Sequence, residues 1–211
     1  MIYKPTEPAA DEVLRNHKRN IERNTLYLEH GIDRERGINF IIDSAGPLRT
    51  PVLDIGTGKG MAAIEMARRG IPVTSIDVSE TELQTAFLNA RAAEVDSSIR
   101  FYIGDAKKLP FEDDQFNFVT MINVLHHVDQ VEGILAEVSR VLAPGGRFLV
   151  ADFTNDGFRI LDRIHKNEGR RHDRMNPIEM DELAGMLQGL GLECRGRDAR
   201  FHQHVILAEK V

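Results

Sequence analysis

The sequence predicts an α/β fold: a doubly wound, largely parallel sheet with helices on both faces. Two observations carry this prediction. Short apolar runs typical of strands alternate with longer segments whose apolar residues recur at helical spacing. The first strand also leads into a glycine-rich turn and then at once into a helical pattern. Strands that alternate with helices build right-handed βαβ units, which cover both faces of a sheet.

Seven strands account for the apolar runs, each bounded by turn-forming residues. The predicted strands cover residues 52–55, 73–77, 101–106, 116–121, 147–152, 192–197 and 201–209. The carboxyl ends of parallel strands meet at one edge of a sheet, and ligands bind outside that edge. Residues that follow these strands are therefore the candidates for a binding site.

Helices fill the intervals between the strands and precede the first one. The predicted helices cover residues 11–29, 34–45, 61–68, 80–90, 131–142 and 177–190. Ser79 and Glu82 form an S-x-x-E capping box at one helix start, and Asn176 before Pro177 is a typical N-cap at another. The run Pro144-Gly145-Gly146 ends the helix with the clearest apolar stripe.

Composition restricts the class of protein. The 211 residues are 42% hydrophobic and 28% charged, which is ordinary for a globular protein. No run of 18 apolar residues predicts a membrane span, and the N-terminus lacks the apolar core of a signal peptide. The single cysteine, Cys194, excludes an internal disulfide, so we expect a cytoplasmic location. The net charge of −6 argues against nucleic acid, and we interpret the basic run at 170–174 as a solvated loop.

The turn after the first strand carries the pattern G-x-G-x-G at Gly56, Gly58 and Gly60. Glycines permit positive φ and let a ligand approach the backbone, and the following helix offers unpaired N–H groups. A dinucleotide fingerprint needs glycine where Met61 stands, and a P-loop needs glycine where Leu53 stands. The turn therefore indicates a nucleotide-like ligand without a phosphate cradle.

Polar residues end the later strands. Asp77 ends the second strand, 21 positions after Gly56. An acid at about this spacing accepts hydrogen bonds from both hydroxyls of a ribose. Asp105 lies at the end of the third strand, Asn123 follows the fourth, and the pair His126 and His127 comes shortly after. We expect these residues to meet at one edge of the sheet.

Five segments in register resemble a known family. They are Leu53 to Gly60, Ile76 to Ser79, Gly104 to Phe111, Leu125 to Val128, and Arg140 to Gly146. With these segments the chain resembles the class I S-adenosylmethionine-dependent methyltransferases, in the small-molecule (type 11) branch that includes quinone-biosynthesis enzymes. The resemblance covers residues 52–152.

The resemblance implies a Rossmann-like, doubly wound sheet of seven strands, with the last strand antiparallel between the fifth and sixth, and an N-terminal helical lid. It implies one methyltransferase domain over residues 1–211. The expected parts are a helical cap at 1–48, a cofactor-binding core at 49–152, and an acceptor-side insertion with the C-terminal strands at 153–211. Within the last part, residues 154–174 are predicted as a polar insertion that closes over a ligand.

The resemblance also implies S-adenosyl-L-methionine as cofactor and S-adenosyl-L-homocysteine as product. The glycine loop would hold the methionine part, Asp54 its ammonium group and Asp77 the ribose. Asp105 and the backbone N–H of Ala106 would contact the adenine. The expected cofactor-binding residues are Asp54, Gly56, Thr57, Gly58, Gly60, Asp77, Val78, Asp105, Ala106 and Asn123. For Asp54, a role limited to capping the loop stays open.

Histidines are the candidate catalytic residues. Methyl transfer from a sulfonium is one in-line displacement, and a base is needed only for an acceptor that loses a proton. The candidates are His126, His127 and His202. Neighbouring helical residues point about 100° apart, so at most one of His126 and His127 is expected to face the pocket. His202 and His204 share one face of a predicted strand, where pocket lining, a metal site and a surface position all stay open, and no metal is predicted.

The acceptor is expected to be a small molecule. The candidate acceptor contacts are Tyr3, Tyr27, Phe153, Phe158, Arg159 and His165. Two other functions use the same cofactor site: different chemistry on S-adenosylmethionine, or a non-catalytic module that binds it. The residue at position 61 argues against a fourth function, a nicotinamide enzyme. A homodimer is left open.

Overall fold

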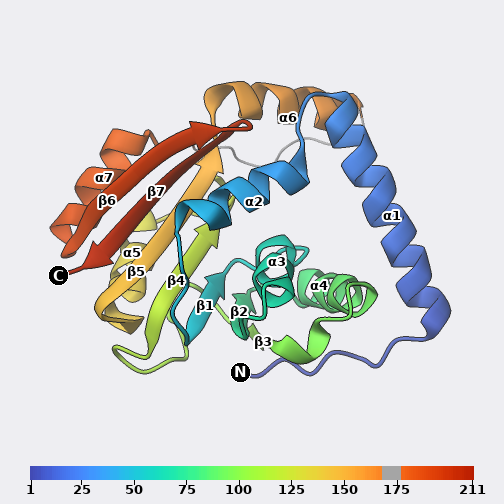
Figure 1. Ribbon diagram of the computed structural model, residues 1–211, viewed down its shortest axis with the longest axis horizontal. Coiled ribbons are helices and arrows are strands. Elements are labelled where there is room, and N and C mark those ends of the chain that lie inside the picture. Colours follow the sequence, from blue (N-terminus) through green and yellow to red (C-terminus); the bar gives the residue numbers. More distant parts are fainter. Residues whose placement is uncertain (168–176) are drawn as a thin grey trace.

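Seven strands form one sheet, and the structure, a computed structural model, describes residues 1–167 and 177–211 (Figure 1). The strands are β1 (Val52–Ile55), β2 (Val73–Asp77), β3 (Ile99–Ile103), β4 (Phe116–Ile122), β5 (Leu142–Phe153), β6 (Leu192–Arg200) and β7 (Gln203–Lys210). Their order is β3-β2-β1-β4-β5-β7-β6. The first five strands pair in parallel, whereas β7 runs antiparallel to both β5 and β6. The predicted sheet is confirmed, including the place of its last strand.

Helices cover both faces of this sheet. One face carries α2 (Arg34–Ser44), α3 (Met61–Arg68) and α4 (Glu80–Ala92), and the other carries α5 (Val131–Val141) and α7 (Met180–Gly189). Alternate residues of β1 divide between the two cores: Val52 packs with the first group of helices, and Leu53 and Ile55 pack with the second. Burial on both faces explains why the central strands are nearly continuous apolar runs.

Two further helices, α1 (Ala10–Glu29) and α6 (Asn155–Asn167), meet beyond the carboxyl ends of the strands. A separate apolar cluster joins them, made of Tyr27, Ile32, Phe158, Leu161 and Ile164. In Figure 1, α6 crosses above the tip of β5, and α1 runs from there past α4. The N-terminal helices expected from the sequence are therefore present, and the C-terminal end of α1 packs against α6 beyond the ligand edge of the sheet.

Part of the predicted polar insertion is a helix. Residues 155–167 form α6, where the sequence analysis expected only a loop. Phe158, Leu161 and Ile164 recur at a spacing of three and are all buried, which is a helical signal. Charged residues between these three positions make the helical pattern hard to recognise in the sequence. Residues 168–176, with His172, the basic run and the Asn176 cap, lie outside the described part of the chain.

Several element boundaries also differ from the prediction: β3 ends at Ile103 and not at residue 106, β6 extends to Arg200, and β7 begins at Gln203 and not at residue 201. The α7 helix begins at Met180 and not directly after Pro177. The β5 strand begins at Leu142 and not at residue 147, because the register against β4 shifts along this stretch and lets the glycine-containing segment stay in the strand. The later start of α7 and the earlier start of β5 leave the strand ends that line the ligand edge in place, and the shorter β3 puts Asp105 and Ala106 in the loop that follows it.

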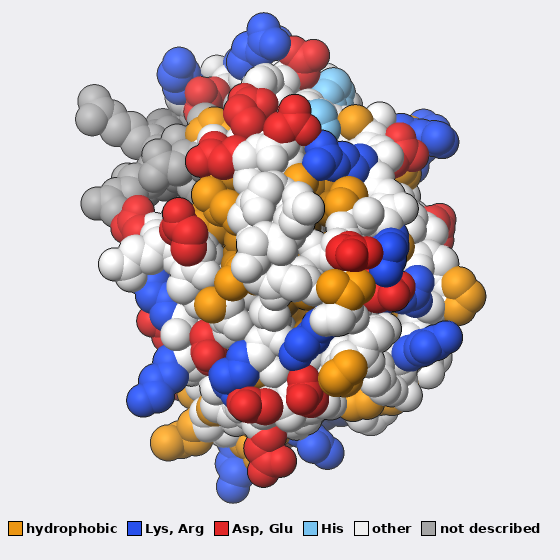
Figure 2. All heavy atoms as spheres, turned by 90° about the vertical axis from the view of Figure 1, so that its left-hand side faces the viewer, with side chains coloured by type: hydrophobic (Ala, Val, Ile, Leu, Met, Phe, Trp, Pro, Cys, Tyr) orange, Lys and Arg blue, Asp and Glu red, His pale blue; other side chains and the backbone are white. Residues whose placement is uncertain are grey.

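The open edge of the sheet at β6 carries charges of both signs. Figure 2 views the molecule from this side and shows acidic and basic side chains interspersed among small hydrophobic groups. Arg195 pairs with Glu193 at 2.9 Å and with Glu209 at 3.3 Å, and Arg200 pairs with Asp198 at 3.3 Å. Charged side chains on an edge strand oppose pairing with another edge. Among the described helices, none is long and apolar enough to cross a membrane.

Candidate active site

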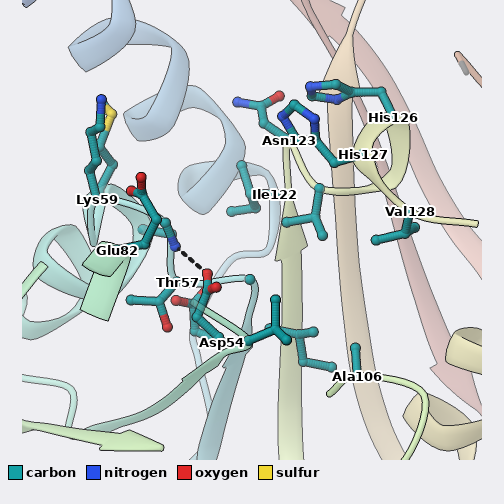
Figure 3. A pocket seen from close by; sticks show the side chains of 18 of the residues that line it. Asp54, Thr57, Lys59, Glu82, Ala106, Ile122, Asn123, His126, His127 and Val128 are labelled. Atoms are coloured by element: carbon teal, nitrogen blue, oxygen red, sulfur yellow. Dashed lines mark hydrogen bonds between the residues drawn. The ribbon is translucent and has the colours of Figure 1, made fainter. Parts of the chain in front are cut away.

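A cavity of about 780 Å³ opens at the carboxyl ends of the parallel strands, with residues of α1, α2 and α6 in its wall. This volume is typical of a pocket for a small ligand. Of the site residues predicted from the sequence, the cavity is lined by Asp54, Gly56, Thr57, Gly58, Asp77, Val78, Asp105, Ala106, Asn123, His126 and His127. Figure 3 shows Asp54 and Thr57 on one side of the pocket and Asn123 with the two histidines on another. Most of the site residues predicted from the sequence therefore lie together at the strand ends, as expected for a ligand site in a parallel sheet.

The glycine loop wraps tightly around the end of β2. Gly56 has φ of 78°, and a Cβ atom there would lie 2.3 Å from Cγ2 of Val124. The backbone N–H groups of Gly56 and Thr57 both donate to the carbonyl of Ile76, at 2.8 and 3.1 Å. Only glycine combines this conformation with this close approach.

Gly60 does not line the pocket, contrary to the sequence prediction. It precedes α3 with φ of 81°, and a Cβ atom there would lie 3.1 Å from the Cβ of Ala86. Its role is to let α3 start close to α4. The G-x-G-x-G pattern therefore combines two glycines at the pocket with one at a helix–helix contact.

Asp77 connects three backbone segments through one carboxylate. Its Oδ2 accepts from the N–H of Gly58 and its Oδ1 accepts from the N–H of Ser79, both at 2.8 Å. Ser79 in turn caps α4, because its hydroxyl accepts from the N–H of Glu82 at 3.3 Å. An ionised carboxylate has about four lone-pair sites, so two backbone bonds leave capacity for a ligand diol.

Asp54 is a buried carboxylate in a row of hydroxyl groups. Ser75 Oγ donates to it at 2.7 Å and Thr120 Oγ1 donates at 2.9 Å. Thr57 Oγ1 lies 2.7 Å from the Ser75 hydroxyl and extends the row to the loop. Burial raises the pKa of Asp54 to about 6, the two hydroxyl bonds oppose this shift, and the charge of Asp77 adds to it. A nearby cation would favour the ionised form and thereby gain affinity.

The rim beyond Asp77 combines apolar surface with one acid. Val78 is 73% exposed, although it lines the cavity, so a flat apolar ligand would cover it. Gly104 lies behind this rim, where a Cβ atom would stand 3.0 Å from Cδ1 of Ile76. Asp105 Oδ1 accepts from the N–H of Lys107 at 2.9 Å, which fixes the turn after β3.

His126 and His127 both line the pocket, so the expectation that at most one would face it is wrong. They lie in a single 3-10 turn, η2 (Leu125–His127), and their rings pack with centroids 3.9 Å apart. The short turn directly follows the end of β4 and is not part of a longer α-helix, so the helical angle between neighbours does not apply. Figure 3 shows the two rings beside Asn123.

Asp152 holds the His126 ring in place. Its Oδ1 lies 2.7 Å from Nδ1 of His126, and its Oδ2 accepts from the backbone N–H of the same residue at 3.1 Å. The N–H of Phe153 adds a third bond at 2.8 Å. Both side chains are almost fully buried, with 3% of His126 and 5% of Asp152 exposed. The arrangement is that of a carboxylate that orients an imidazole.

Two amide side chains in the pocket contain buried oxygens without a hydrogen-bond donor among the described residues. They are Oδ1 of Asn123 and Oε1 of Gln203. Asn123 adopts a left-handed φ of 57°, and its backbone N–H donates to the carbonyl of Ala151 at 2.8 Å. Buried acceptors normally have a partner, so a ligand hydroxyl or amine that donates here would be stabilised.

The cap side of the pocket is basic. Arg23 and Arg34 lie over the ring of Tyr27, at 5.3 and 5.0 Å from its centroid. The Tyr27 hydroxyl accepts from Nη2 of Arg23 at 3.1 Å and lies 3.4 Å from Nε2 of His165. Nη1 of Arg34 donates to Oδ1 of Asn24 at 2.7 Å. Burial lowers the pKa of the Arg34 guanidinium, and the charge of Arg23 acts in the same direction.

The predicted acceptor contacts fall into two groups. Tyr27, Phe153 and His165 line the main cavity, whereas Tyr3, Phe158 and Arg159 do not. Tyr3 instead donates to Oε1 of Gln84 at 2.9 Å beside α4.

His202 also lies outside the main cavity, so its expected place beside the acceptor is not what the structure shows. Together with His204 and Arg159 it borders a second hollow near the start of α6. The reason is local: Phe201 and His202 form the left-handed turn between β6 and β7, with φ of 52° and 61°. The strand β7 begins only at Gln203, so His202 is not part of the strand and does not share a strand face with His204. Gln203, the first residue of β7, is buried and lines the main cavity.

Three residues of the site escaped the sequence analysis: Gln203 and Arg34 in the wall of the pocket, and Asp152 behind His126. Asp152 stands next to the end of β5, so the rule that identified Asp77 at the end of β2 would have found it. Gln203 and Arg34 carry no local signal. Their places depend on how the C-terminal hairpin and α2 pack against the sheet.

The strand order, the glycine loop and the acids at the ends of β1 and β2 define the fold class of the class I methyltransferases. Comparison with known families agrees. Residues 53–150 match the family model described as a methyltransferase domain, and through this segment the chain belongs to that family.

Individual relatives and structures extend this result. The demethylmenaquinone methyltransferase of Tropheryma whipplei (strain Twist) is 38% identical over 161 residues, which cover 67% of this chain and 66% of that protein. The PH0226 protein of Pyrococcus horikoshii OT3 is similar in structure, with a TM-score of 0.70, 22% identity, and coverage of 84% and 90% of the two chains.

A structure described as the [4+2]-cyclase SpnF is also similar, with a TM-score of 0.67, 19% identity, and coverage of 83% and 81%. At these identities the two structural likenesses show the fold alone. The chain spans 40%, 55% and 41% of the length of three other curated relatives that it matches.

Proposed function

We propose that this protein is an S-adenosylmethionine-dependent methyltransferase that acts on a small-molecule acceptor. One observation carries the proposal: two acids, Asp54 and Asp77, stand at neighbouring strand ends on either side of the glycine loop and line one cavity. S-adenosylmethionine is a nucleoside that also carries an amino acid. One acid would accept from its ribose hydroxyls, and the second would bind its ammonium group. Bound S-adenosylmethionine would supply a methyl group already activated on a sulfonium.

The residues present fit this cofactor. Asp77 retains lone pairs for the two ribose hydroxyls while it holds the loop. Asp54, whose ionised form is disfavoured by burial, would be stabilised by the cofactor ammonium group. Val78 and Ala106 would flank the adenine, and Asp105 would accept from its amino group.

His126 is the proposed base for an acceptor that loses a proton. Its Nδ1 is engaged by Asp152, so Nε2 is the nitrogen that would accept the acceptor proton. Asp152 acts as a positioning residue that sets the ring orientation. The low exposure of His126 also restricts water near the transferring methyl group.

A second function uses the same cofactor without methyl transfer. The similarity to a structure described as a [4+2]-cyclase motivates it, because that protein has this fold and a different reaction in its description. Such a protein would bind S-adenosylmethionine and leave its methyl group in place.

Two measurements test the proposal. Calorimetry should show binding of S-adenosylhomocysteine and a much weaker interaction with NAD; tight NAD binding without S-adenosylhomocysteine binding would refute it. Incubation with S-adenosylmethionine labelled on the methyl group and a library of small metabolites should transfer label to an acceptor. Binding without transfer to any acceptor would favour the second function.

A further inference from the structure

We propose that the acceptor carries an anionic group, a carboxylate or a phosphate, which binds the guanidinium of Arg34 at the cap end of the pocket. This inference rests on the proposed function and adds to it the chemical class of the acceptor. It depends on three observations: the surroundings of Arg34, the separation of charges along the pocket, and the fixed orientation of the guanidinium.

Arg34 is a partly buried cation that has no counterion among the described residues. Within residues 1–167 and 177–211, its partners are the neutral side chains of Asn24 and Tyr27, and no Asp or Glu forms an ion pair with it. Two other partly buried arginines pair with acids: Arg69 with Glu65 at 2.9 Å, and Arg140 with Glu137 at 2.7 Å. A third, Arg147, donates instead to the backbone carbonyls of Ala45 and Pro47. A charge withdrawn from water is costly unless an opposite charge compensates it. An anionic ligand would supply that compensation.

Charges are separated along the pocket. The described acids that line it are Asp54, Asp77, Glu82, Asp105 and Asp129, and all belong to β1, β2, α4 or the loops after β3 and β4. Lys59 and Lys107 line the same part of the pocket, where the five acids outnumber them. The lining residues from the cap helices α1, α2 and α6 include two arginines and a histidine but no described acid. The acidic half suits the ammonium and sulfonium of the cofactor, and the basic half suits an anion.

The guanidinium of Arg34 is held ready for a ligand. The Tyr27 ring lies under it at 5.0 Å, and Asn24 accepts one of its five N–H donors. The remaining donors can form the two parallel bonds that a carboxylate or phosphate accepts. Because Tyr27 and Asn24 already restrict the side chain, binding loses little rotamer entropy.

The test compares anionic and neutral probes of one shape. Benzoate, phenyl phosphate and benzamide are titrated into the full chain with and without saturating S-adenosylhomocysteine. Arg34→Met removes the charge and keeps the length of the side chain, and Arg34→Lys keeps a charge without the planar fork. Arg36→Met is the matched control, since Arg36 is exposed on the same helix, stacks on Phe201 and does not line the pocket.

The wild type and Arg36→Met should bind at least one anion roughly 10- to 150-fold more tightly than benzamide, the range expected for one charged hydrogen bond. Arg34→Met should lose this preference, Arg34→Lys should retain part of it, and the affinity for S-adenosylhomocysteine should not change. The tighter of benzoate and phenyl phosphate then distinguishes a carboxylate from a phosphate acceptor.

Equal affinity for the charged and neutral probes in the wild type would overturn the inference, as would an equal loss in Arg36→Met. Failure to bind S-adenosylhomocysteine, with the anion preference intact, would instead refute the proposed function and leave the anion site established. The two failures are therefore distinguishable.

Discussion

The Nδ1 atom of His126 lies 2.7 Å from Oδ1 of Asp152, although 26 positions separate the two residues. Parallel pairing of β4 with β5 brings them together, because η2 follows β4 and Asp152 stands next to the end of β5. The same carboxylate also accepts the backbone N–H groups of His126 and Phe153. The imidazole therefore has a defined orientation at the wall of the pocket.

His126→Ala is expected to lower turnover by roughly 100- to 10,000-fold on an acceptor that loses a proton, the range for general base catalysis. The affinity for S-adenosylhomocysteine should remain within about threefold of the wild type, because the proposed cofactor contacts come from the ends of β1, β2 and β3 and from Asn123 after β4. Turnover and calorimetry measure the two effects. Wild-type turnover in His126→Ala would exclude the base role, and His127→Ala serves as the neighbouring control.

Asp152→Asn is expected to lower turnover less than His126→Ala, because an amide can still contact Nδ1 of His126 but fixes the imidazole less firmly than the carboxylate does. Turnover equal to that of the wild type, combined with a lower melting temperature, would indicate a purely structural role for Asp152. Asp162→Asn on α6 is the control, because it removes an acid outside the pocket wall.

Asp77→Ala should raise the dissociation constant for S-adenosylhomocysteine roughly 10- to 150-fold, through loss of charged hydrogen bonds to the ribose. The same carboxylate holds the N–H groups of Gly58 and Ser79, so the free energy of unfolding should fall by about 1–2 kcal/mol. Calorimetry and urea denaturation measure the two effects. Glu80→Ala removes an exposed acid that does not line the pocket and should change neither.

The affinity for S-adenosylhomocysteine should fall as pH drops below about 6. The bound ammonium group favours ionised Asp54, whose pKa in the ligand-free protein is about 6, so each further pH unit costs at most about tenfold in affinity. The α-amino and α-carboxyl groups of the ligand titrate outside this window. Calorimetry between pH 4.5 and 7.5 tests the effect, since roughly these values bracket the pKa. Asp54→Asn should weaken binding at neutral pH and remove the dependence, and a similar slope in the variant would assign it to another group.

The stability of the ligand-free protein should depend on pH in the opposite sense to the ligand affinity: the contribution of Asp54 should fall as pH rises. The pKa of Asp54 is raised in the folded state from 3.8 to about 6, so its contribution to stability is fully present below 3.8 and is lost as pH rises through 6. Urea denaturation across this range should therefore show a more stable Asp54→Asn variant at neutral pH. A variant less stable than the wild type at pH 7 would contradict this.

Gly56→Ala should destabilise the fold by at least about 2 kcal/mol. Alanine at a left-handed φ costs about 1–2 kcal/mol, and crowding against Val124 adds about 1–3 kcal/mol. Gly133→Ala on α5 is the control, because no atom lies within 4 Å of its added Cβ and alanine favours a helix, so stability should rise by about 0.5–1 kcal/mol. Equal melting temperatures for the two variants would contradict this account of the loop.

Local chemistry explains what could be predicted from the sequence. The apolar run of β1, the turn glycines and the helical stripe after them act within about ten residues, so their pattern alone indicates strand, loop and helix. Asp77 was predictable for the same reason, since it stands at a strand end and its spacing from Gly56 is set by one βαβ unit. The capping hydroxyl of Ser79 is equally local, and the structure confirms its bond to the N–H of Glu82.

The acceptor side was decided by the tertiary structure alone. His202 looked equivalent to a pocket residue, yet a left-handed turn moved it to another hollow and put Gln203 in the wall. Arg34 had no signal at all, because its place depends on the packing of α2 against the sheet. The physical reason is common to both: motifs act through short-range geometry, whereas the walls of this half of the pocket come from segments at opposite ends of the chain that meet only when the core is buried.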